Sequence, residues 1–150
     1  MRYQSPAPVQ AVFLDMPLIT GEEVPQNPWL AVTARAWPGL VAVHHQAGPD
    51  VFDLEALIAR PARIGVTETA LFAAAAGVWD RGPALRVRML SGQLASVPPA
   101  AVLGGANLMA IGDGVVWELF QFTEAELVEP GLYDLRLRLR GQQGTDGVMP

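Results

Sequence analysis

The sequence contains no cysteine, no lysine and only two histidines in 150 residues. Without cysteine there can be no disulfide, thiolate metal site or thiol nucleophile, so the fold must depend on packing. No apolar run approaches the roughly 20 residues that a helix needs to cross a bilayer, which predicts a protein without a membrane span. All basic residues are arginine, and a formal net charge of −5 argues against nucleic-acid binding, because such domains usually carry a basic excess.

The residues that commonly carry catalysis form no recognisable motif. His44 and His45 are neighbours, so in a strand they point to opposite faces and have no third imidazole with which to bind a metal. None of the serines lies in a G-x-S-x-G turn, and the glycines near residues 104 and 112 lack the lysine of a phosphate-binding loop. We therefore predict no catalytic residue, no metal site and no cofactor.

Short apolar segments separated by proline and glycine predict a single β-rich domain over residues 1–150. We expect an antiparallel β-sandwich or a barrel-like fold with one or two short helices. The expected strands include 9–16, 29–37, 40–47, 63–71, 84–90 and 106–111, with 29–37 and 40–47 forming a hairpin around Pro38-Gly39. The expected helices cover 53–60, where Leu54, Leu57 and Ile58 have helical spacing, and 96–103.

The stretch from 113 to 145 predicts one long β-hairpin with a turn at Glu129-Pro130-Gly131-Leu132. Its first arm changes the parity of its apolar residues near Thr123, as a strand does at a β-bulge. We predict a register with Leu127 opposite Leu135 and an irregular turn, although a tight turn would by itself give a register one residue away. This register also places Glu126 opposite Arg136, and Glu124 opposite Arg138.

The second arm of this hairpin alternates apolar and charged residues without interruption. Tyr133, Leu135, Leu137 and Leu139 share one parity, and Asp134, Arg136, Arg138 and Arg140 share the other. This pattern predicts a half-buried strand with one solvent-facing side. Because the glutamates of the first arm would leave Arg140 without a partner, we predict that Arg136, Arg138 and Arg140 form a docking interface; a merely solvated strand face is the alternative.

Several segments resemble the host-specificity protein of gene transfer agents, a very large tail-tip or baseplate component, sometimes called the megatron, that is similar to the tail-tip hub proteins of long-tailed phages. The segments are VFLDMPLITGEEVP, WDRGPALRVRML, AAVLGGANLMAIGDG, WELFQF and YDLRLRLRGQQGTD. The resemblance extends from Val12 to Pro150 and is most specific at RLRGQQGTD. It implies that the chain is a segment from the C-terminal half of a longer polypeptide, and it carries no catalytic motif over to these residues.

This resemblance implies a structural module involved in tail assembly and host attachment, located in the tail of a phage-like particle that is assembled in the bacterial cytoplasm. The implied partners are other tail-tip or baseplate modules and subunits and the bacterial cell envelope, with a homo-oligomer possible in the full-length protein. Two alternatives are a carbohydrate-binding module and an accessory domain of an envelope-degrading enzyme. The four tryptophans discriminate between them, because a sugar binder would expose several rings along one groove.

Overall fold

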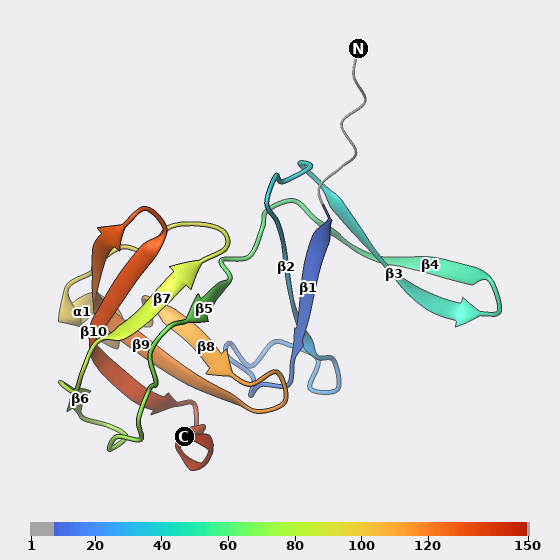
Figure 1. Cartoon of the computed structure of the whole chain (residues 1–150). Coiled ribbons are helices and arrows are strands. Elements are labelled where there is room, and N and C mark those ends of the chain that lie inside the picture. The colour runs from blue at the N-terminus through green and yellow to red at the C-terminus, as the bar shows by residue number, and fades with distance from the viewer. Residues whose placement is uncertain (1–7, 150) are drawn as a thin grey trace.

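The computed structural model describes residues 8–149 and consists mainly of antiparallel β-strands (Figure 1). The strands form two separate two-stranded ribbons and one six-stranded sheet. One α-helix, α1 (Pro99–Leu103), and a 3-10 turn at Asp146–Val148 accompany them. The predicted mainly β class with a short helix is confirmed, and the described strands do not close into a barrel. In residues 8–149 we find no helix with the length and apolar character needed to cross a membrane.

The first ribbon pairs β1 (Val9–Leu14) with β2 (Trp29–Ala34) in antiparallel fashion. Val32 of β2 is buried, and its carbonyl accepts a hydrogen bond of 2.7 Å from the backbone N–H of Ala62. This bond attaches the ribbon to the segment that leads into the six-stranded sheet.

The second ribbon pairs β3 (Val41–Gly48) with β4 (Val51–Ile58), and we call it the arm. The predicted pairing of 29–37 with 40–47 is wrong, because β2 pairs with β1 and β3 pairs with β4. The predicted helix over 53–60 is also wrong, because these residues form a strand with a β-bulge. The register shifts between Val43 and His44, which leaves Glu55 as an extra residue between Leu54 and Ala56. An apolar spacing of three residues therefore fits a bulged strand as well as a helix.

The six-stranded sheet has the order β5–β7–β10–β9–β8, and β6 also pairs with β10. Its core consists of Leu71, Leu85, Val87, Phe120, Phe122, Tyr133 and Leu135, so the main hydrophobic cluster lies entirely within the C-terminal part of the chain. The strands are β5 (Gly65–Thr67), β6 (Trp79–Asp80), β7 (Leu85–Met89), β8 (Leu108–Gly112), β9 (Trp117–Glu129) and β10 (Leu132–Gln142).

The predicted hairpin is present as β9 and β10, but its predicted register is wrong by two residues. Leu127 lies opposite Tyr133, not Leu135. The turn is tight, with Glu129 paired to Leu132 and Gly131 at a φ of 77°, and one extra residue in β9 then shifts the register. Together, the tight turn and the adjacent bulge change the register by two residues, so each residue still lies opposite residues of the parity that was predicted. The pattern of apolar and charged faces is therefore the same in the predicted and the observed register and could not distinguish them.

Candidate functional site

The alternation of β10 reverses at Leu137, which has a φ of 50° in the left-handed region that leucine rarely adopts. Before this point Tyr133 and Leu135 face the core, and after it Arg138 and Arg140 are only 1% and 0% exposed. The prediction that Arg136, Arg138 and Arg140 share a solvent face is therefore wrong for the last two. Only Arg136 is exposed.

Arg138 is held by Asp80, which lies on the short strand β6 beside β10. Its Nε and Nη2 donate hydrogen bonds of 2.9 and 2.8 Å to Asp80 Oδ2, and its Nη1 donates one of 2.8 Å to the Leu135 carbonyl. Burial alone would raise the pKa of Asp80. The Gly82 N–H and the Arg138 guanidinium more than offset it, so the pKa of the Asp80 carboxyl lies below its ordinary value.

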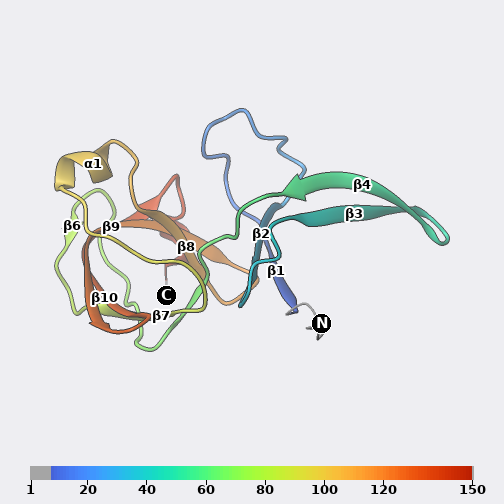
Figure 2. The same ribbon diagram turned by 90° about the horizontal axis from the view of Figure 1, so that it is seen from above.

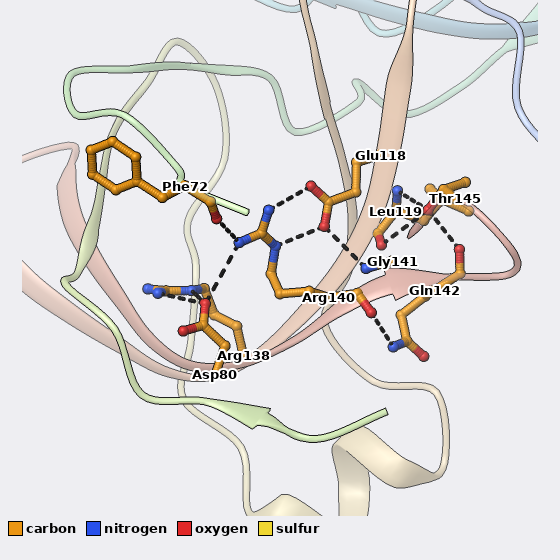
Figure 3. A network of polar contacts seen from close by, with 9 residues as sticks. All are labelled: Phe72, Asp80, Glu118, Leu119, Arg138, Arg140, Gly141, Gln142 and Thr145. Carbon is orange, nitrogen blue, oxygen red and sulfur yellow. Dashed lines mark hydrogen bonds and ion pairs between the residues drawn. The ribbon is translucent and has the colours of Figure 1, made fainter. Parts of the chain in front are cut away.

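Arg140 makes a two-point ion pair with Glu118 of β9 (Figure 3). Its Nε and Nη2 donate hydrogen bonds of 2.7 Å to the two carboxylate oxygens, and its Nη1 donates to the Phe72 carbonyl. The backbone N–H of Gly141 also donates to Glu118 Oε1 at 3.0 Å. The premise that Arg140 lacks a partner is wrong, because the carboxylate comes from within β9 and not from the glutamates near the turn.

The two pairs form one network, since Arg140 Nη1 also lies 3.6 Å from Asp80 Oδ2. The segment 72–80, which ends in β6, lies along this face of the hairpin. Figure 3 shows the Phe72 carbonyl beside the Arg140 guanidinium, and Asp80 beside the guanidinium groups of both Arg138 and Arg140. Buried charges that are paired and hydrogen-bonded fix strands and loop in one arrangement. Both acidic side chains are occupied by arginine, so the network is built to hold structure and has no free carboxylate for acid–base chemistry.

The other candidate chemical groups are dispersed. His45 Nδ1 lies 2.9 Å from Glu55 Oε2 on the exposed arm, and His44 is on the opposite face. Within the part of the chain that the structure describes, no group of three His, Asp or Glu residues is placed to hold a metal ion. Glu124 lies opposite Arg136, and Glu126 lies opposite Asp134, so the predicted pairings of these glutamates with Arg138 and Arg136 are wrong.

The tryptophans divide between locations, and all four are half-buried. Trp29 and Trp117 line the same cavity of about 470 Å³, whereas Trp37 and Trp79 lie elsewhere. We call this cavity the edge groove. Most other lining residues are aliphatic, and the Asn107 amide already donates to the carbonyls of Ala95 and Phe122 at 2.9 and 3.2 Å. Arg63 is the one charged residue of the lining. Two aromatic rings among mainly aliphatic walls, with a single free polar side chain beside them, fit a largely apolar guest better than a sugar.

The arm carries several exposed large apolar side chains close together. The pairing of Ala42 with Leu57, His44 with Leu54, and Gln46 with Phe52 places alternate residues of β3 and their partners on one face. On that face, which we call the arm face, the large side chains Phe52, Leu54 and Leu57 are 62%, 54% and 57% exposed. Figures 1 and 2 show the arm extending away from the six-stranded sheet.

Sequence reasoning missed Asp80 and Glu118 as partners and missed the arm. Glu118 offered a usable signal, because it is the only charge in the apolar stretch VVWELFQF, and a lone carboxylate inside a buried strand requires a cation. Asp80 offered none, since its sequence context resembles a surface loop.

Comparison with known families gives one finding. The family model described as Rcc01698-like, C-terminal, matches residues 62–150. This range contains every strand of the six-stranded sheet, its core and the buried ion network. No curated protein matches the chain.

Proposed function

This chain belongs to the Rcc01698-like C-terminal family, and from that premise we propose that it is a non-enzymatic structural module of a phage-like tail tip. Its role in this proposal is to join neighbouring modules or subunits in the tail of a gene-transfer-agent particle and to help present the tip to the bacterial envelope. The family membership and the resemblance of the segments around WELFQF and RLRGQQGTD support the tail-tip assignment.

The exposed arm is the observation that best supports a role in assembly. A two-stranded ribbon is marginally stable by itself, and an arm face with Phe52, Leu54 and Leu57 in water is unfavourable unless another protein covers it. The six-stranded sheet forms a rigid base for the arm, because its buried Arg–Asp and Arg–Glu pairs fix the hairpin and the segment 72–80 beside it. A rigid body with a projecting apolar arm is suited to joining modules.

Immunogold electron microscopy on particles from a bacterium that encodes this chain would test the proposal. An antibody raised against residues 62–150 should label one end of the tail, and the full-length protein carrying Leu54→Asp should yield fewer complete tails. Val115→Asp is the matched control, because Val115 is 79% exposed and lies in the turn before β9. Label on the capsid, or only in the cell envelope of producing cells, would contradict the proposal.

A further inference from the structure

The two edge strands of the six-stranded sheet face a common gap. In the order β5–β7–β10–β9–β8, the first and last strands each have one side without a strand partner. The edge groove is lined by Ile64 and Gly65 at β5 and by Leu108, Met109 and Ala110 of β8. A second cavity, of about 420 Å³, is lined by Thr67 of β5 and by Ile111 and Gly112 of β8. The gap therefore follows both open edges.

Both open edges retain main-chain groups that could pair with another strand. The outer side of β8 has no ladder, and none of the other backbone hydrogen bonds among residues 8–149 involves Leu108–Gly112. The two residues that flank β5 bond only toward β7 and its neighbours, through the Ile64 carbonyl and the Glu68 N–H. Unpaired strand edges beside an apolar groove are suited to accepting an extended segment of another chain.

We propose that the edge groove receives the arm of a second copy of this chain, in a head-to-tail contact. This inference names the partner of the arm and rests on the proposed assembly role. Both surfaces of the proposed contact are present on the same chain. The arm face offers Phe52, Leu54 and Leu57, and the groove offers Leu14, Leu30 and Met109 among its apolar walls.

The arm as a whole and the edge groove carry charges of opposite sign. Residues 41–58 contain three carboxylates, Asp50, Asp53 and Glu55, and no arginine. The groove contains Arg63, which is exposed and has no carboxylate within 4.0 Å among the described residues. Asp50 lies in the turn of the arm, and Asp53 and Glu55 lie on the side of His45, opposite the arm face. The negative charge of the arm is attracted to the free guanidinium of the groove while the arm face remains free to enter it.

The arm is directed away from its own groove. In both views β3 and β4 extend on the side of the β1–β2 ribbon that is remote from the six-stranded sheet (Figures 1 and 2). The arm face and the groove of one copy thus remain available to two different neighbours. A contact that uses different surfaces on the two partners generates a closed ring or an open chain of copies.

The test uses purified chain and measures mass by light scattering and by sedimentation velocity, over concentrations up to about 1 mM. The parent should self-associate. Leu54→Asp places a charge on the arm face and leaves the groove intact, and Arg63→Glu reverses the charge of the groove and leaves the arm intact. Each single variant should be monomeric. Mixed together they should form a 1:1 dimer, because the intact arm of the second variant can enter the intact groove of the first. Val115→Asp should associate as the parent does.

Three results would overturn the inference: a parent that remains monomeric throughout, single variants that associate as strongly as the parent, or a mixture of the two that remains monomeric. Because all three substitutions are at exposed positions, unchanged circular dichroism will show that the variants are folded. If the parent were monomeric, the proposed tail-tip role would still hold, but the partner of the arm would be a different protein. The immunogold experiment can likewise fail while self-association holds.

Discussion

Arg140 of β10 and Glu118 of β9 are joined by two hydrogen bonds of 2.7 Å, and their side chains are 0% and 1% exposed. Such a pair is stabilising only as a whole, because removing one partner leaves the other charged, buried and unpaired. The pair lies at the far end of the hairpin from its turn, where the ladder becomes irregular, and it holds β9 and β10 together there.

Breaking the pair should therefore be costly. Arg140→Ala and Glu118→Gln are each expected to lower the free energy of unfolding by about 3–5 kcal/mol, as measured by urea denaturation. Arg136→Ala, on the same strand but exposed, should change it by no more than about 0.5 kcal/mol. The double variant Glu118→Leu/Arg140→Met should regain part of the loss, since no charge remains buried. Equal effects of Arg136→Ala and Arg140→Ala would contradict the structural role.

Acid should destabilise the protein through Asp134 and Asp80. Two hydrogen bonds from Arg86, of 2.7 and 2.9 Å, are the main cause that lowers the pKa of Asp134. A carboxyl whose pKa is lower in the folded state stabilises it fully above the unfolded pKa of about 3.9, and this stabilisation is lost as the pH falls through the folded pKa. Each such group contributes a slope of up to about 1.4 kcal/mol per pH unit in that acidic window.

Denaturation curves recorded between pH 5 and the acid limit, about 2, would measure this slope. Asp134→Asn should flatten the acid limb of stability against pH, and Arg86→Met should flatten it in the same way, because it removes the donor that lowers the pKa of Asp134. An acid limb as steep as that of the parent in both variants would show that Asp134 is not linked to folding.

The left-handed conformation of Leu137 should make this position intolerant of β-branched residues. Leu137→Val is expected to lower the free energy of unfolding by about 1–3 kcal/mol, because β-branched side chains are disfavoured at positive φ. Leu127→Val makes the same chemical change at an exposed position of β9 and should alter stability by no more than about 0.5 kcal/mol. If the two variants were equally stable, the backbone reversal at Leu137 would not constrain folding.

Residues 62–150 should fold without the preceding ribbons. Every member of the main hydrophobic cluster lies between Leu71 and Leu135, and the buried pairs of Arg138 and Arg140 are made within the same range. We expect the fragment to unfold in one cooperative transition and to give dispersed amide resonances. Residues 1–61 alone should not, since two-stranded ribbons are marginal in isolation. A molten fragment 62–150 would show that the β1–β2 ribbon completes the core.

The sequence by itself determined the features that depend on neighbouring residues. The β-bulge predicted near Thr123 is wrong, because the ladder of β9 and β10 shifts only between Leu132 and Tyr133 and between Leu139 and Gln142. Period-2 alternation and turn residues were nevertheless sufficient to predict the β class and the hairpin of β9 and β10 with its turn at Pro130-Gly131. Each of these depends on backbone preferences and on contacts across a few residues, which a local pattern records.

Tertiary structure decided the rest. Leu54 and Leu57 have a spacing compatible with a helix or a bulged strand, and only pairing with β3 selected the strand. Arg138 and Arg140 alternate with leucines as surface residues do, yet the reversal at Leu137 turns both inward. Their partners, Asp80 and Glu118, are 58 and 22 residues away in the chain. Burial of a charge is decided by whether folding brings a counter-charge to it, and the alternation along a single strand contains no information on a partner so distant.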